Sequence, residues 1–266
     1  MVMLPNPFTP RRPVAPERFV GRIYEIAAAC ALVNARGHVA IWGGPGMGKR
    51  SLLEKLASPQ TMEEHGLDPS VAVVVLLSCE SITPFTPYGF WEEVLKEIND
   101  KLDRGSQLQV EIETFLGEGG ASRNSLRHVL KELGRQNKFL LLLVDDFDVV
   151  LSPNEKYAEA DMVTFLSECR SLAVHCHESK YLSMIVTSRK RLNELNPTLN
   201  LNASPWFNHY LFLHLQLFTE QEVEELLKPL TTQMTLQLRE NISQMAGRHP
   251  TLLQIAGFHL YNLFNF

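Results

Sequence analysis

The sequence predicts an α/β fold in which a five-stranded parallel sheet carries helices on both faces and is followed by a small helical subdomain. Three observations support it. Five short apolar segments recur along the first 217 residues, helical patterns lie between them, and only helical patterns follow. Four of the five segments are almost continuously apolar, as strands buried on both faces must be. Strands that alternate with helices form a parallel sheet covered on both sides.

The apolar segments and helical patterns have defined ranges. We expect strands at residues 38–42, 71–77, 139–144, 182–186 and 210–217. The last segment alternates in part, which is typical of an edge strand or of one covered on a single face. Apolar residues at helical spacing predict helices at 26–33, 49–57, 88–102, 125–136 and 160–173. The long connection after the second strand should hold at least two helices, with a glycine-rich break at 117–120.

The two ends of the chain differ from the sheet region. Five prolines between residues 5 and 16 favour extended backbone, so residues 1–17 are expected to form an extended arm before a core at 18–218. Thr219, followed three residues later by Glu222, predicts a capping box that opens a helical subdomain at 219–266. Its last apolar helix, at 251–264, stops almost at the end of the sequence. We therefore expect the subdomain to be truncated.

Composition excludes several classes of protein. At 266 residues and 45% hydrophobic composition, the chain can bury a sizeable core, so it is neither disordered nor fibrous. A formal charge of -5 gives no sequence-wide attraction to nucleic acid or to anionic lipid. The four cysteines are scattered through apolar stretches, which indicates a reducing cytosol. Without a signal peptide or membrane span, we expect a soluble cytoplasmic protein that contacts neither membrane nor nucleic acid.

One segment has the pattern of a phosphate site. Residues 38–57 read HVAIWGGPGMGKRSLLEKLA, which is an apolar strand, a glycine-rich loop with a lysine, and an apolar helix. This is the context that a P-loop requires, because loop N–H groups and the helix dipole bind phosphates and the lysine reaches the outer ones. The alternative is a glycine-rich turn of structural use. The pattern predicts that ATP or ADP binds to Gly43, Gly44, Pro45, Gly46, Met47, Gly48, Lys49, Arg50 and Ser51.

The residue after Lys49 departs from the pattern. A serine or threonine hydroxyl normally coordinates Mg²⁺ there, but this chain has Arg50, which cannot bind a metal. Ser51 has a hydroxyl, yet one residue along a helix is a rotation of about 100°, so we expect it to point elsewhere. Nucleotide binding should survive this change more easily than metal-assisted hydrolysis.

A second strand ends in carboxylates. KFLLLLVDDFDVVL places Asp145 and Asp146 at the carboxyl edge of the sheet, where ligands bind in such folds. Asp145 is the expected partner of Mg²⁺, usually through water, and Asp146 is the candidate to orient or deprotonate an attacking water. The alternative is that these residues cap the next loop, which is the role that we expect for Asp148.

Together these segments resemble the STAND branch of the AAA+-like P-loop ATPases, relatives of the NACHT and NB-ARC switch proteins. RFVGRIYEI resembles the FVGR motif, GGPGMGKRSLL the Walker A motif, LLLLVDDFD the Walker B motif, MIVTSRKRL the sensor-1 strand and MAGRHPTLLQIAGFHL the Gly/Pro module. The resemblance implies that Phe19, Val20, Gly21, Arg22 and Pro250 flank the adenine. It also implies that Arg189 senses the γ-phosphate. The alternatives are that Pro250 only starts a helix and that Arg189 is a solvated charge.

The function that we expect is a regulatory switch. ATP or ADP would lie between sheet and helical subdomain and be hydrolysed slowly, with Lys49, Asp146 and Arg189 as catalytic residues. The resemblance implies a larger signalling or defence protein, with a winged helix and repeats beyond Phe266 and with protein partners or self-oligomers. Two alternatives stay open: a non-hydrolysing nucleotide-binding scaffold with Arg50 as its signature, and a DNA-associated ATPase like the origin-recognition loaders.

Overall fold

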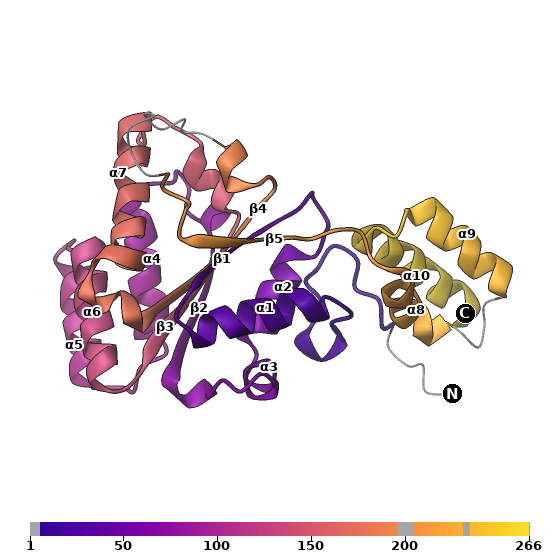
Figure 1. Ribbon diagram of the computed structural model, residues 1–266, viewed down its shortest axis with the longest axis horizontal. Coiled ribbons are helices and arrows are strands. Elements are labelled where there is room, and N and C mark those ends of the chain that lie inside the picture. The colour runs from indigo at the N-terminus through magenta and orange to yellow at the C-terminus, as the bar shows by residue number, and fades with distance from the viewer. Residues whose placement is uncertain (1–5, 196–204, 231–234, 266) are drawn as a thin grey trace.

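The computed structural model describes residues 6–195, 205–230 and 235–265, and it has a sheet domain and a smaller helical subdomain (Figure 1). Five parallel strands form one sheet in the order β2-β3-β4-β1-β5, so the predicted fold class is confirmed. The strands are β1 (His38–Trp42), β2 (Ala72–Ser78), β3 (Phe139–Asp145), β4 (Leu182–Ser188) and β5 (Tyr210–His214). β5 lies at an edge, as its alternation predicts.

Four strands differ from their predicted ranges. β3 and β4 run one and two residues further than predicted, to Asp145 and Ser188, and β2 runs one residue further, to Ser78. β5 ends at His214 rather than at residue 217. Leu215 N still donates to Trp42 O at 2.8 Å, but β1 turns into the glycine-rich loop after Trp42 and the ladder ends there. β2 starts at Ala72, since Pro69–Val71 forms a 3₁₀ turn that the Asp68 side chain caps.

Helices cover both faces of the sheet. On one face lie α1 (Ile23–Asn34), α2 (Lys49–Ala57) and α3 (Pro59–Glu64); on the other lie α4 (Pro87–Asn99), α5 (Gln107–Gly117), α6 (Arg123–Arg135) and α7 (Glu159–Arg170) (Figure 1). The connection between β2 and β3 therefore holds three helices, and the predicted glycine-rich break separates α5 from α6. The predicted helix at 160–173 is too long, because α7 ends at Arg170 and a π turn follows at Ser171–His175.

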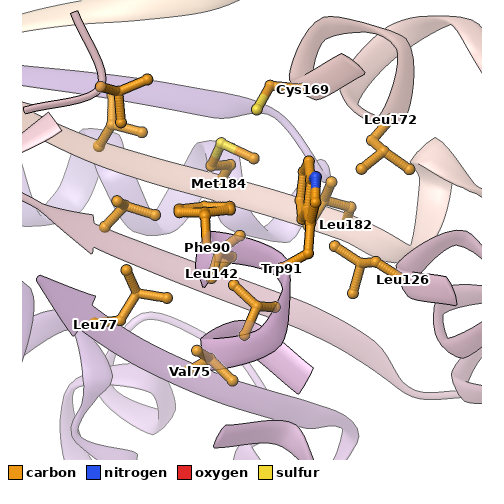
Figure 2. Close-up of a cluster of buried hydrophobic side chains, with 14 of the residues drawn as sticks. Val75, Leu77, Phe90, Trp91, Leu126, Leu142, Cys169, Leu172, Leu182 and Met184 are labelled. Carbon is orange, nitrogen blue, oxygen red and sulfur yellow. The ribbon is translucent and has the colours of Figure 1, made fainter. Parts of the chain in front are cut away.

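Apolar side chains fill both sides of the sheet. Figure 2 shows part of the larger cluster, in which Val75, Leu142 and Met184 project from three neighbouring strands toward Phe90 and Trp91 of α4. Every residue of β3 and of β4 is buried. Burial of this kind stabilises a fold by about 25 cal/mol per Å² of apolar surface. The strands are thus a frame that fixes the positions of the residues at their carboxyl ends.

The helical subdomain consists of α8 (Glu220–Leu227), α9 (Leu236–Ala246) and α10 (Pro250–Asn265). The predicted capping box is confirmed, since Thr219 N donates to Glu222 Oε2 at 2.7 Å and Glu222 N donates to Thr219 Oγ1 at 3.2 Å. Its core contains Phe218, Val223, Leu227 and Leu253. No described helix is long and apolar enough to span a membrane.

The N-terminal arm packs on this subdomain rather than extending freely. Phe8 is buried in the subdomain core, and a Cβ at Gly257 would lie 2.4 Å from its ring. Asn6 Nδ2 donates to Phe258 O at 3.0 Å and to Asn262 Oδ1 at 2.7 Å. Residues 6–9 therefore belong with α10 by packing. Residues 1–5 of the predicted arm and Phe266 lie outside the described residues, and the boundaries 1–17, 18–218 and 219–266 stay predictions.

Candidate functional site

The glycine-rich loop joins β1 to the start of α2. Gly46 and Gly48 have φ of +74° and +86°, a left-handed backbone that glycine adopts without strain. Gly46 is required for space as well, because a Cβ there would lie 2.7 Å from the His249 ring and 2.8 Å from the Thr251 hydroxyl. The loop apex is thus pressed against the start of α10.

Lys49 is the first residue of α2, and its ammonium folds toward the loop. Nζ donates to Gly43 O at 2.6 Å and to Gly44 O at 3.1 Å. Burial lowers the pKa of Lys49; the charges of Asp145, Asp148 and Asp146 oppose the shift, and Arg189 adds to it. The ammonium therefore lies in the middle of a cluster of charges, where an anion can contact it.

The two carboxylates lie where three strands end. Asp145 is buried at the end of β3, and its Oδ1 accepts a hydrogen bond from Thr187 Oγ1 of β4. Burial raises its pKa, and the Thr187 bond and the charge of Arg50 oppose that rise. Asp146 has φ of +55°, and its Oδ2 accepts from Ser78 Oγ of β2 at 2.8 Å.

Ser78 was missed by sequence reasoning, although a hydroxyl directly after a predicted strand is a signal that could have found it. Parallel pairing aligns Ser78 with Asp145, so the end of β2 had to meet the end of β3. The Ser78 hydroxyl fixes the carboxylate that was predicted to orient water.

Asp148 positions the segment that carries Arg189. Both of its carboxylate oxygens accept from Arg189 N, at 3.1 and 2.9 Å. The Arg189 guanidinium is exposed, and its Nη2 lies 3.9 Å from Glu80 Oε1. Asp148 therefore caps a loop, as expected, but the loop is the one after β4 that begins at Arg189 rather than its own.

The FVGR segment joins the two parts of the molecule. Arg22 is buried, its Nη2 donates to Gln216 O at 2.5 Å, and its guanidinium lies 5.0 Å from the centre of the Phe218 ring. Its backbone N donates to Glu222 Oε1 at 2.8 Å. Gly21 has φ of +72°, and a Cβ there would lie 2.2 Å from Glu222 Oε1. Gly21 and Arg22 thus hold the linker and α8, while their predicted contact with adenine stays a prediction.

A cavity of about 450 Å³ brings most of the predicted residues together. It lies among the loop, the strand ends and the helical subdomain, and its volume is within the range of small-molecule sites. The predicted residues that line it are Phe19, Val20, Arg22, Pro45, Gly46, Met47, Gly48, Lys49, Arg50, Ser51, Asp145, Asp146, Arg189 and Pro250. Of the described residues, Gly21, Gly43 and Gly44 were predicted for the site but do not line the cavity.

The cavity also has a wall that the sequence did not predict. Residues 9–14 of the arm line it, together with Phe218, Leu226, Thr251 and Gln254. Two bonds fix the arm there: Thr9 N donates to Gln254 Oε1 at 3.1 Å, and Val14 N donates to Ser51 Oγ at 3.0 Å. Prolines identified an extended segment, but only the folded chain shows what this segment contacts.

The residues present do not match the donor set that Mg²⁺ has at a P-loop. Arg50 occupies the hydroxyl position, and its Nε donates to Glu54 Oε1 at 3.2 Å. The Ser51 hydroxyl is buried and accepts from the arm. The one side chain predicted to hold the metal is the Asp145 carboxylate, and it already accepts a hydrogen bond from Thr187. The assignment of Asp145 to Mg²⁺ therefore stays a prediction that this geometry does not favour.

Comparisons with known proteins agree with the fold. Residues 14–264 match the protein family described as "AAA-like domain". No curated protein matches the sequence. The structure is similar to the Walker-type ATPase of Pyrococcus abyssi, with a TM-score of 0.68 and 16% identity over 95% of this chain and 71% of that one.

Two further solved structures are similar to the chain. They are the ADP form of the Aeropyrum pernix ORC2 protein (TM-score 0.56, 14% identity, 88% of this chain and 60% of that chain) and Drosophila ORC bound to DNA (TM-score 0.53, 16% identity, 94% and 58%). At such identities the likeness concerns the fold alone. The chain spans less than two thirds of the length of either of these two chains.

Proposed function

This chain belongs to the AAA-like domain family, and from that premise we propose that it is a nucleotide-dependent switch with slow ATP hydrolysis. ATP or ADP occupies the cavity between the sheet domain and the helical subdomain, and the position of the subdomain reports which nucleotide is bound. We further propose that, within this family, the chain belongs to a STAND-like branch of signalling proteins. Protein partners or further copies of the chain then receive the signal in the cytoplasm.

The observation that carries the proposal is the contact of α10 with the phosphate loop. The His249 ring Nε2 lies 3.1 Å from Pro45 O, and Thr251 Oγ1 donates to Gly46 O at 2.8 Å. These bonds use loop carbonyls, so they leave the loop N–H groups for phosphate oxygens. Any change in the loop on binding is thereby passed directly to the start of α10.

Positive charge supplies the difference between nucleotides. Lys49 and Arg189 line the same cavity, and in the proposed complex each contacts the γ-phosphate that ADP lacks. A ligand that holds a two-state equilibrium almost fully one way must bind the two states with affinities that differ by roughly 10⁴, about 5.5 kcal/mol. Two charged contacts provide a substantial part of that difference, at about 1.5–3 kcal/mol each.

Hydrolysis should be slow. Asp146 is the candidate to orient water, but one of its oxygens accepts a hydrogen bond from Ser78. The metal-binding hydroxyl is replaced by Arg50. The second candidate function, a scaffold that binds nucleotide without hydrolysing it, is favoured by this same replacement. Nucleic acid is not expected as a partner, given the formal charge of -5.

Hydrogen exchange with ATP, with ADP and without nucleotide tests the switch. We expect ATP and ADP to protect the phosphate loop alike, and to protect His249 and residues 251–256 of α10 differently, because the γ-phosphate moves the loop against them. A phosphate-release assay separates switch from scaffold, since the scaffold releases none. Equal protection of α10 by both saturating nucleotides would exclude the switch, and turnover comparable with the roughly 1 to 100 s⁻¹ of kinases would exclude slow hydrolysis.

A further inference from the structure

We propose that Arg50 takes the place of Mg²⁺ in this site, so that the chain binds the metal-free form of a nucleoside triphosphate. The inference rests on the proposed nucleotide site and specifies the chemical form of its ligand.

Arg50 stands at the position whose hydroxyl would otherwise coordinate the metal ion. It follows Lys49 on the first turn of α2 and lines the cavity together with Lys49 and Asp145. A guanidinium in this place repels a divalent cation and attracts the phosphate oxygens that the cation would bridge.

The Arg50 side chain is held in a way that leaves its donors available. Its Nε bond to Glu54, one turn later on α2, orients the guanidinium. That bond uses one N–H, and the two terminal nitrogens carry four more, in a planar fork that matches two phosphate oxygens. Lysine in the preceding position supplies a point charge, whereas arginine supplies a bidentate contact.

The hydroxyl that could compensate is engaged elsewhere. Ser51 Oγ accepts from Val14 N at 3.0 Å, which ties α2 to the arm. The Thr187 hydroxyl donates to Asp145. Both of these hydroxyls thus have a structural partner, and Arg50 contributes a permanent positive charge instead of a ligand.

The charge of the whole cavity agrees with this assignment. Seven arginine and lysine side chains line it against three carboxylates, Glu80, Asp145 and Asp146, which is a surplus of four positive charges. The chain as a whole carries a formal charge of -5. Such a local excess suits a triphosphate that keeps its full negative charge, because no metal is needed to offset repulsion among its oxygens.

Calorimetric titration of the purified chain with ATP, in EDTA and in excess Mg²⁺, tests the assignment. We expect the apparent dissociation constant of the parent chain to be about tenfold or more larger in excess Mg²⁺ than in EDTA, because the metal then competes with the chain for ATP. Arg50→Thr removes the guanidinium and restores the hydroxyl, so its affinity in EDTA should fall about 10- to 100-fold, the effect of a charged bidentate contact. Excess Mg²⁺ should restore much of that loss.

Lys55→Ala is the matched control. It removes one positive charge from the same helix at a residue that does not line the cavity, and it should bind like the parent chain in both buffers. Melting curves of each variant check that it is folded. Arg50→Lys keeps the charge without the planar fork, so its affinity in EDTA should lie between those of the parent and Arg50→Thr.

The outcomes separate this inference from the proposed function. Binding by the parent chain only in Mg²⁺ would overturn the role of Arg50 and leave the switch intact. Equal affinity of the parent chain in the two buffers would also overturn it, and so would binding in EDTA that Arg50→Thr retains unchanged, because another group would then replace the cation. Absence of ATP binding in either buffer would overturn both.

Discussion

Apolar packing holds the sheet domain and the helical subdomain together internally, whereas polar contacts join the two parts to each other. In the sheet domain, apolar clusters lie on both faces of fully buried strands (Figure 2). In the subdomain one small cluster depends on Phe8 from the arm, while Met245 and Leu263 are 86% and 72% exposed. Between the two parts, hydrogen bonds converge on the phosphate loop and on Arg22. Apolar burial therefore builds the frame, and directional bonds of about 1 kcal/mol each build a joint that can be rearranged.

The largest expected effect contrasts the two cores. Leu142 of β3 and Leu253 of α10 are both 0% exposed. Leu142→Ala should reduce the free energy of unfolding of the sheet domain by about 3–5 kcal/mol, because the rigid frame cannot close the cavity. Leu253→Ala should loosen α8 to α10 and leave the sheet nearly unchanged. Urea unfolding followed by residue-level hydrogen exchange measures both, and loss of sheet protection in Leu253→Ala would mean that the two parts form one cooperative unit.

The next prediction concerns a change that should weaken nucleotide binding and leave the stability of the sheet domain unchanged. Lys49→Ala should weaken ATP binding by about 100-fold, since a charged contact to the outer phosphates is lost. The midpoint of unfolding should hardly change, because Lys49 Nζ bonds only within the loop, to Gly43 and Gly44. Fluorescence titration with ATP checks the first expectation and a thermal melt the second, with Lys55→Ala as control. Unchanged affinity would show that the loop does not bind phosphate.

These two predictions also mark what the sequence could and could not provide. The strands and the phosphate loop were predictable because local patterns determine them: continuous apolar runs, glycines at positive φ, and a lysine at the start of a helix. The Ser78 bond to Asp146 depends on strand order, which no local pattern contains. The arm wall of the cavity depends on Phe8 reaching α10 across more than 240 residues of sequence. Pairwise tertiary contacts of this kind carry almost no local signal.

Acid should weaken the frame at its β5 edge. Burial lowers the pKa of His209 to about 3, with the charges of His38 and Arg170 contributing. Because the pKa is depressed in the fold, its stabilisation is complete above the ordinary value of 6.5 and is lost as the pH falls toward 3. At pH 5 the loss is about 2 kcal/mol. Urea unfolding from pH 7.5 to 5 should show this slope, and His209→Phe should flatten it.

Removing one bond between α10 and the phosphate loop should change the free energy of unfolding least. It should have its main effect on how α10 responds to the bound nucleotide. Thr251→Val keeps the shape of the side chain but removes the hydroxyl that donates to Gly46 O. We expect a change of about 1 kcal/mol, confined to the start of α10, because one hydrogen bond is lost and both groups can reach water. The difference in α10 protection between ATP and ADP should shrink, while ATP affinity stays near that of the parent chain.

Thr164→Val is the matched control for this change. Its hydroxyl donates within α7, to Ala160 O at 2.9 Å, on the far side of the sheet from the joint. This variant should lose a similar small amount of stability and keep the ATP and ADP patterns of the parent chain. If Thr251→Val and Thr164→Val give the same nucleotide patterns, the contact between α10 and the phosphate loop holds the two parts together without transmitting a signal. The link would then have to run through Arg22, whose guanidinium reaches the linker carbonyl of Gln216.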